Sequence, residues 1–528
     1  MSFSSFAPLA PRHDRLGGLQ TLYANPLPWL LLLAAAHVAV RVAISPALKW
    51  DEAQQILWSQ ELALGYGAQP PLYTWLQWGV NQLFGPSVLA VSLLKQTLIA
   101  LTCVFMWLAA RELMGRRAAW WAAASLWALP PFGWYSIRDQ THTVLVTAMT
   151  CAAWWLLLRI MRREGRGGQR DFIALGLVCG FGMLSKYNFA LMLGAFALAL
   201  LSVRETRRAL LGRGWWWAVL IALALFAPHA EWLLRHWHEA TVGTFRQMDI
   251  QTRGQWAVGV AQGFGNLALS SLGTLGLWGI FALAAFGSAW RRRPVAPESA
   301  PSPSPAWLRP VFGRYLALIA VALALMVLAA GVTVFKGRWV LPLLAPAPLM
   351  ALALRPGLEW DPRGWRLTVL TLGLCLVILV AAGARPWIGT LDGSVDELNH
   401  SAAQLGRALK SAGYDGRGRI IAADHMLAGM LRTRFPAAPA DFCRGRDGPV
   451  TDCVAASVGR AESAGLGWLV ISRADRLEAD WWSQALARLP GGDALPRGNL
   501  RIPFLMTLGG HEPASYDFAW HPPRPQQP

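Results

Sequence analysis

Apolar runs of roughly the length needed to cross a bilayer recur along this 528-residue chain and stop near residue 384. Lipid offers no water to the backbone, and about 18 or more apolar residues in succession indicate a membrane-spanning helix. Charged residues make up only 15% of the chain, against about 25% in soluble globular proteins. The sequence therefore predicts an all-α polytopic membrane domain.

We expect about eleven transmembrane helices between residues 26 and 384, preceded by a polar N-terminal segment at 1–25. Two of the spans are short and meet at a turn around Lys186, because the run 171–202 is too long for one span and carries a charge at its centre. A Pro- and Ser-rich stretch, 291–310, is expected to be a linker. The expected spans are 26–44, 86–110, 118–132, 141–158, two within 171–202, 215–229, one that follows a polar loop at 231–262 and ends at Trp290, 311–334, 339–354 and 367–384.

The formal net charge of +18 does not indicate a nucleic-acid partner, because the basic residues cluster between spans. Such clusters mark cytoplasmic loops by the positive-inside rule. We therefore expect a multi-pass protein of the bacterial inner membrane, with a cytoplasmic N-terminus and a C-terminal part on the periplasmic side. The clusters lie at 116–117, 159–170, 204–213, 291–293 and 355–366.

Residues 385–528 differ from the preceding apolar spans in composition, since they are rich in Gly, Asp and Arg. Two strand-like runs, 419–423 and 468–472, and a helix-like run, 426–435, predict a soluble α/β domain large enough for its own core. Cys443 and Cys453 can form a disulfide if this domain lies in an oxidising compartment. The other four cysteines lie in apolar spans and are expected to pack as small hydrophobic residues.

The first outer loop, residues 45–85, carries adjacent carboxylates, Asp51 and Glu52, directly after the first span. Two amphipathic pieces, 51–64 and 72–84, are rich in Trp, Tyr and Gln, which is typical of helices at a membrane interface. A carboxylate there can act as a general base or as a metal ligand. An equally weighted alternative is that Asp51 and Glu52 cap a helix N-terminus, where a negative charge contributes about 0.3–1 kcal/mol of helix stability.

Polar groups near the outer ends of other spans are candidates to line the same site. Lys95 lies about a third of the way into the second span, where an ionisable group is costly and indicates function; snorkelling of its amino group is the alternative. Arg138 and His142 begin the fourth span and share a helical face if the helix starts there.

Lys186, between two short spans, and the compact turn Lys336-Gly337-Arg338 place cations on the expected outer side, where basic residues are otherwise scarce. Two cations flanking a glycine suit an anionic phosphate, which Arg can bind through two hydrogen bonds. A lipid phosphate held there as leaving group, with a carboxylate deprotonating an acceptor, is the layout needed for glycosyl transfer from a polyprenyl phosphate.

These stretches together resemble the integral-membrane glycosyltransferases of the GT-C fold, over residues 26–384. The resemblance is to bacterial relatives of protein O-mannosyltransferases and of the aminoarabinose transferase that modifies lipid A. It rests on their order and placement more than on any single one. The stretches are Trp50-Asp51-Glu52, Pro70-Pro71-Leu72-Tyr73-Thr74-Trp75-Leu76, Gly182-Met183-Leu184-Ser185-Lys186-Tyr187 and Lys336-Gly337-Arg338-Trp339.

The resemblance implies a polyprenyl-phosphate sugar donor, inversion at the anomeric carbon, and a glycolipid, glycan or protein acceptor reached from the periplasm. It implies that Asp51 is the catalytic carboxylate, assisted by Glu52, and that carrier-phosphate contacts come from the other motif residues. Two departures stand out: Gln69 replaces a Lys that several relatives carry before the Pro pair, and Thr141-His142-Thr143 stands where many carry Pro-Asp. The substrate- and phosphate-binding candidates are Lys186, Tyr187, Lys336, Arg338, Lys95, Arg138, His142 and Gln69.

Some members of that family hold a divalent metal, and the candidate ligands here are Glu52, His229 and Glu231. The spacing of His229 and Glu231 is not that of a fixed metal motif, and a solvated interfacial helix is the favoured interpretation of them. Two other functions remain open: a flippase or transporter of lipid-linked sugars, and a ligase or polymerase that uses a diphosphate-linked donor.

Overall fold

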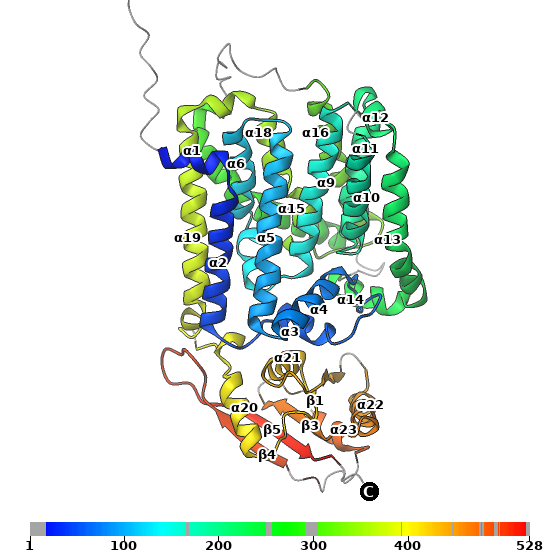
Figure 1. Cartoon of the computed structure of the whole chain (residues 1–528), viewed down its shortest axis with the longest axis vertical. Coiled ribbons are helices and arrows are strands. Elements are labelled where there is room, and N and C mark those ends of the chain that lie inside the picture. The colour runs from blue at the N-terminus through cyan, green and yellow to red at the C-terminus, as the bar shows by residue number, and fades with distance from the viewer. Residues whose placement is uncertain are drawn as a thin grey trace, which may run out of the picture.

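The computed structural model describes residues 17–164, 168–249, 256–290, 305–391, 393–445, 448–474, 477, 480–489, 495 and 497–523. Figure 1 shows a tall helical domain with a smaller α/β domain at one end, here called the domain end. The predicted N-terminal segment and linker fall outside the described residues for most of their length. The described chain thus has the two-part organisation expected from the sequence.

Seven of the described helices are long and apolar enough to cross a membrane, or eight if the bent pair α11 and α12 counts as one span. Their apolar side chains face outward on α2, α13 and α15, as expected of surfaces in contact with lipid. The long helices are α2 (Leu27–Ile44), α5 (Val88–Arg111), α9 (His142–Arg162), α13 (Trp215–Arg235), α15 (Trp256–Phe286), α16 (Leu308–Leu328) and α19 (Trp365–Ile388).

The other expected spans coincide with shorter or broken helices. The predicted span 118–132 is divided near Leu129 because two prolines follow, and the span 339–354 contains Pro342 and Pro346. Neighbouring helices bury most of these segments, so irregular backbone there is tolerated. They are α6 (Arg116–Ser125), α7 (Pro130–Gly133), α10 (Gln169–Met183), α11 (Asn188–Leu201), α17 (Gly337–Leu344) and α18 (Ala347–Ala353). Segments between expected spans form α8 (Tyr135–Arg138) and α12 (Arg204–Leu210).

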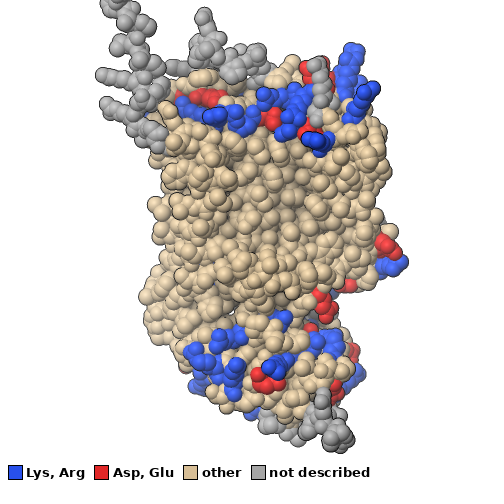
Figure 2. Space-filling model, in the orientation of Figure 1, with Lys and Arg blue, Asp and Glu red and all other residues tan. Residues whose placement is uncertain are grey.

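Charged side chains gather at the two ends of the face drawn in Figure 2, separated by a broad band of other residues. This is the distribution of a domain whose middle lies in hydrocarbon. The predicted turn around Lys186 is confirmed, since it joins α10 to α11. Helix α1 (Gly17–Ala24) lies at the far end from the α/β domain (Figure 1).

The C-terminal domain is built on a five-stranded sheet in the order β2-β1-β3-β5-β4. Strands β1, β2 and β3 are parallel, whereas β5 runs antiparallel to β3 and β4. Helices cover the sheet, and a disulfide joins Cys443 to Cys453. Its elements are α20 (Ala402–Ser411), β1 (Arg419–Ala422), α21 (His425–Arg434), β2 (Ala440–Phe442), α22 (Val450–Ser463), β3 (Trp468–Arg473), α23 (Trp481–Leu486), β4 (Arg497–Ile502) and β5 (Ala514–His521).

The first outer loop forms α3 (Trp50–Trp58) and α4 (Leu72–Phe84), with α14 (Trp237–Met248) nearby (Figure 1). Helix α3 ends six residues before the predicted boundary at residue 64. It does not lie only at a bilayer surface, because α21 packs directly on it. A Cβ added at Gly429 would lie 2.9 Å from the Cβ of Ala53. The apolar face that suggested a membrane interface is therefore partly covered by the C-terminal domain.

Candidate active site

Glu52 is buried in a network of ion pairs at the start of α3. Its two carboxylate oxygens lie 2.7 Å from a guanidinium nitrogen of Arg41 and 2.9 Å from the amino group of Lys95. Burial alone would raise the pKa of Glu52, but Arg41 and Lys95 outweigh burial and hold that pKa well below its usual range. Glu52 also accepts a hydrogen bond from the backbone N–H of Lys49, as a helix cap does. Lys95 therefore does not snorkel outward; it joins α5 to α3.

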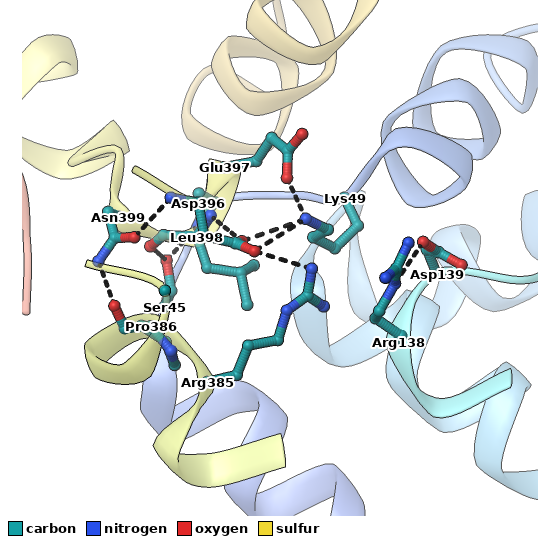
Figure 3. A network of polar contacts seen from close by, with 12 residues as sticks. Ser45, Lys49, Arg138, Asp139, Arg385, Pro386, Asp396, Glu397, Leu398 and Asn399 are labelled. Atoms are coloured by element: carbon teal, nitrogen blue, oxygen red, sulfur yellow. Dashed lines mark hydrogen bonds and ion pairs between the residues drawn. The ribbon is translucent and has the colours of Figure 1, made fainter. Parts of the chain in front are cut away.

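The C-terminal domain holds the N-terminus of α3 in place. Figure 3 shows the amino group of Lys49 between the carboxylates of Asp396, 3.1 Å away, and Glu397. Arg385, at the end of α19, reaches the other oxygen of Asp396 at 2.8 Å. Because Lys49 precedes α3 directly, these pairs tie that helix to both the C-terminal domain and α19.

Asp51 is the carboxylate left free by this arrangement. In the described part of the chain it has no hydrogen bond or ion pair, although it is partly buried. Burial raises the pKa of Asp51 to about 6, with Arg338, Lys186 and Lys95 opposing that rise and Asp139 adding to it. A carboxylate with such a pKa can accept a proton near neutral pH, as a general base must.

Lys336 and Arg338 converge on one side-chain oxygen of α14. The amino group of Lys336 and a guanidinium nitrogen of Arg338 lie 3.2 and 3.0 Å from Oε1 of Gln247. Two cations that share one neutral oxygen can instead share a phosphate oxygen. Both cations of the turn therefore reach the same point, as binding of one phosphate would require, and their phosphate-binding role stays a prediction.

Lys186 approaches the same region from the α10–α11 turn. Its amino group donates to Oγ1 of Thr143 at 2.9 Å. Burial, together with Arg338 and Lys336, lowers the pKa of Lys186 to about 7, while Asp51 opposes that decrease. The charges of Lys186 and Arg338 thus act on Asp51, as expected if all of them surround one substrate.

Arg138 and His142 do not share one helical face, contrary to the expectation. Arg138 ends α8 and His142 begins α9, because the chain between them is not helical. Arg138 pairs with Asp139 at 2.9 Å, whereas Nε2 of His142 lies 3.0 Å from Nε2 of Gln55. His142 therefore contacts Gln55 of α3. Asp139 is the residue of this turn whose charge acts on Asp51.

The remaining candidates, Tyr187, His229 and Gln69, lie near the start of α4 and the C-terminal part of α13. Tyr187 OH is 3.3 Å from Nε2 of His229, whose Nδ1 lies 2.6 Å from the carbonyl oxygen of Leu64. Gln69 exchanges backbone hydrogen bonds with Tyr66. Its side-chain oxygen is buried without a partner in the described structure. These residues support the loop that carries the Pro pair.

The three candidate metal ligands do not come together. Glu52 pairs with Arg41 and Lys95, His229 contacts Leu64 and Tyr187, and Glu231 pairs with Arg235 at the surface. Across the described residues, no group of three His, Cys, Asp or Glu side chains could hold a metal ion. The divalent metal stays a prediction, and we derive no step through it.

Three important side chains were not selected from the sequence. Arg41 interrupts the apolar first span, and a charge there is a signal of function or pairing. Tyr73 is fully buried with no partner for its hydroxyl in the described chain; burial first, then Glu52 and Asp51, raises its pKa. Gln247 lies in the segment 231–262 that was predicted as a polar loop, part of which forms α14, and it gives no sequence signal.

Comparison with known proteins decides the family. Residues 68–232 match the family described as dolichyl-phosphate-mannose-protein mannosyltransferase. The lipopolysaccharide core galacturonosyltransferase RgtA of Rhizobium johnstonii is 30% identical, over 93% of this chain and 96% of RgtA. The chain belongs to the GT-C family of membrane glycosyltransferases.

Other similarities agree with this membership. RgtB, also a lipopolysaccharide core galacturonosyltransferase of Rhizobium johnstonii, is 29% identical over 78% of this chain and 82% of RgtB. The crystal structure of ArnT from Cupriavidus metallidurans bound to undecaprenyl phosphate superposes with a TM-score of 0.56 at 15% identity. That superposition covers 94% of this glycosyltransferase and 98% of ArnT, and it shows that the fold extends through the C-terminal domain. The predicted fold class and enzyme class are confirmed.

Proposed function

We propose that this glycosyltransferase moves a uronic-acid sugar, of the galacturonosyl type, from a polyprenyl phosphate to a lipopolysaccharide-type glycolipid. The observation that carries the proposal is a free carboxylate, Asp51, in the first turn of α3, on which the charges of Lys186 and Arg338 act. The names of RgtA and RgtB, and the undecaprenyl phosphate bound to ArnT, support the donor and acceptor classes. A protein acceptor is not needed to explain the site.

In the proposed reaction an acceptor hydroxyl oxygen attacks the anomeric carbon of the donor. The bond from that carbon to the phosphate oxygen breaks, and the hydroxyl proton passes to Asp51. The phosphate gains a second negative charge as it leaves, and Lys336 and Arg338 are placed to stabilise that charge. In-line displacement of this kind inverts the anomeric centre, as the family resemblance implies.

The charge balance of the site favours an anionic sugar. Lys186, Lys336 and Arg338 supply three positive charges against the one negative charge of Asp51. A sugar–polyprenyl phosphodiester carries one negative charge, and a uronate carboxylate adds a second. We assign Lys336 and Arg338 to the phosphate because they share Gln247, and Lys186 to the sugar carboxylate because its amino group bonds Thr143 and not Gln247.

The proposal is tested by offering the purified enzyme galacturonosyl and galactosyl polyprenyl phosphates with the same lipopolysaccharide acceptor. We expect kcat/KM for the uronate donor to exceed that for the neutral donor by about 10–100-fold, since a charge-assisted hydrogen bond contributes about 1.5–3 kcal/mol. Lys186→Gln should remove most of that preference. Equal use of both donors would contradict the uronate assignment.

Two further experiments distinguish the proposed transferase from the two alternative functions. Transfer from a diphosphate-linked donor at a higher rate would favour a ligase or polymerase. Movement of a fluorescent polyprenyl-phosphate sugar across liposomes, with no transfer to acceptor, would favour a flippase. Against a flippase, Asp51, Lys186, Lys336 and Arg338 gather in one place, since Lys186 and Arg338 act on the charge of Asp51, and Arg338 and Lys336 on that of Lys186.

The pH dependence of kcat/KM should be bell-shaped. Asp51 must be ionised to accept a proton, so activity should fall as pH drops below about 6. Lys186 must be protonated to bind an anion, so activity should also fall as pH rises above about 7. Lys186→Arg should extend the alkaline side, because Arg keeps its charge. An alkaline limb unchanged in that variant would assign it to another group.

We place the site on the periplasmic side of the bacterial inner membrane. Helix α12, which carries part of the basic cluster 204–213, lies at the end opposite the C-terminal domain (Figure 1), as the positive-inside rule requires for a periplasmic domain. The Cys443–Cys453 disulfide supports an oxidising compartment. An impermeant thiol reagent applied to cells carrying single cysteines in the C-terminal domain tests this orientation.

A further inference from the structure

Helix α3 is covered by neighbouring segments on every side except one. Five of its nine residues are buried, whereas the other four keep exposed surface. Because an α-helix has about 3.6 residues per turn, those four lie within about 100° of the helix circumference. They form what we call the open stripe of α3, which carries the proposed general base together with two tryptophans and an amide: Trp50, Asp51, Gln54 and Trp58.

The covered faces of α3 are held by both domains, so the open stripe has a fixed orientation. Towards the helical domain, Oε1 of Gln55 accepts a hydrogen bond from the hydroxyl of Thr74 at 2.9 Å. On the other side α21 lies against α3 (Figure 1), where Ala53 packs on Gly429 and Leu57 belongs to the core of the C-terminal domain. Since these faces are occupied, a substrate reaches Asp51 from the side of the open stripe.

Trp50 is the most exposed residue of the open stripe, with 42% of its surface accessible. The C-terminal domain fixes its ring from two directions. The ring of His425 meets it edge-on with centroids 3.7 Å apart, and the guanidinium carbon of Arg444 lies 5.3 Å from its centroid. Trp50 therefore presents a rigid, flat apolar surface one residue from the proposed base. Such a surface packs against the C–H face of a sugar ring and loses little side-chain entropy in doing so.

Arg444 places a cation beside this surface. Among the described residues it makes no ion pair and no hydrogen bond, and its contact with Trp50 is a cation–π interaction. The residue before it is firmly held: the N–H of Cys443 donates to the carbonyl oxygen of Ala422 at 2.9 Å, and its carbonyl oxygen accepts from the indole of Trp481 at 2.7 Å. The disulfide ties the same residue to α22. The N–H groups of Arg444 are thus available for a carboxylate or a phosphate.

Trp58 ends the open stripe on the side of the helical domain. Its ring stacks on Tyr66 with centroids 5.7 Å apart and meets the ring of His142 at 6.3 Å. Between the two tryptophans, the amide of Gln54 makes no hydrogen bond within the described chain, so it can donate to and accept from sugar hydroxyls. The helix rises about 12 Å from Trp50 to Trp58 at about 1.5 Å per residue, which is roughly the length of a disaccharide.

We propose that the open stripe of α3 and Arg444 together form the subsite for the acceptor glycan and hold its accepting hydroxyl beside Asp51. A sugar ring packs on Trp50, and Arg444 binds an anionic group of the acceptor, a carboxylate or a phosphate. That this ligand is an acceptor rests on the proposed function. A glycan is favoured over bilayer lipid because both groups that fix Trp50 belong to the C-terminal domain, which forms the charged lower end of Figure 2, beyond the apolar band.

The test measures transfer by the full-length enzyme to four forms of lipopolysaccharide: native, carboxyl-reduced, dephosphorylated, and treated in both ways. Arg444→Gln should raise KM for the native acceptor by about tenfold or more, because it removes a charge-assisted hydrogen bond, with KM for the donor within about twofold of wild type. The rise should vanish with the doubly treated acceptor, and the single treatment that reduces it identifies the anion. A rise of equal size with the doubly treated acceptor would overturn the assignment of Arg444.

Trp50→Leu, which removes the flat ring, should also raise the acceptor KM by about tenfold, whereas Trp50→Phe keeps an aromatic face and should retain most of the affinity. The matched controls are Trp360→Leu, at a tryptophan after α18 that is 43% exposed, and Arg488→Gln, at an exposed cation of the C-terminal domain. Both controls should leave the acceptor KM near wild type. An unchanged acceptor KM in Trp50→Leu, or an equal rise in Trp360→Leu, would overturn the proposal.

Binding of lipopolysaccharide core oligosaccharide to the purified enzyme, followed by saturation-transfer NMR without donor, gives a reading that does not need turnover. Binding to the wild type that is lost in Arg444→Gln and Trp50→Leu supports the subsite even if the uronate donor has been assigned wrongly. Absence of binding to the wild type at millimolar oligosaccharide would overturn the subsite. Displacement of the oligosaccharide by added phosphatidylglycerol would show a contact with bilayer lipid and would also overturn it.

Discussion

Asp51→Asn is expected to lower kcat by about 10²–10⁴-fold, the usual contribution of a general base. The substitution keeps the shape of the side chain and removes only its ability to take a proton. Asp51 makes no ion pair or hydrogen bond in the described structure, so the substitution should cost α3 no more than the contribution of a charge in its first turn, about 0.3–1 kcal/mol. The measurement is transfer of radiolabelled sugar from polyprenyl phosphate to lipopolysaccharide by purified enzyme.

Two controls show whether the loss of activity in Asp51→Asn comes from the missing proton acceptor. Asp452→Asn, at a surface ion pair with Arg488 in the C-terminal domain, should leave kcat unchanged. Binding of polyprenyl phosphate to Asp51→Asn should stay near wild type or tighten, because a negative charge facing the phosphate has been removed. Transfer by Asp51→Asn within a few-fold of wild type would show that another group takes the proton.

Glu52→Gln is expected to destabilise the enzyme by about 3–5 kcal/mol, because it leaves Arg41 and Lys95 buried without their shared counter-charge. The neighbouring carboxylates thus have different roles. Asp51 accepts the proton, whereas Glu52 joins α3 to α2 and α5. Thermal unfolding in detergent, followed by size-exclusion chromatography after heating, measures the loss. A large decrease in the unfolding temperature is the expected outcome.

A second substitution separates this explanation from a general loss of packing. Lys95→Met added to Glu52→Gln removes one of the stranded charges and should restore part of the stability. Glu231→Gln, at an exposed pair with Arg235, should change stability by less than about 1 kcal/mol. A Glu52→Gln enzyme that is inactive yet as stable as wild type would instead support the role in catalysis or metal binding inferred from the sequence.

The sequence by itself determined the architecture, because hydrophobic length and charge distribution are properties of single segments. The apolar run at 26–44 requires a helix in lipid whatever surrounds it, and the helical pattern at 426–435 is equally local. The break between α10 and α11 was also readable, since Lys186 cannot lie in the middle of a hydrocarbon-spanning helix.

Only the tertiary structure decided which of two adjacent carboxylates is free. Asp51 and Glu52 are equivalent in composition and spacing, and their difference arises from Arg41 on α2 and Lys95 on α5, which are brought to one side of α3 by packing. The sharing of Gln247 by Lys336 and Arg338 and the grouping of His37, Ser92 and Gln96 around one cavity arise in the same way. Such sites depend on contacts between distant segments, and neither hydrophobic periodicity nor local spacing specifies those contacts.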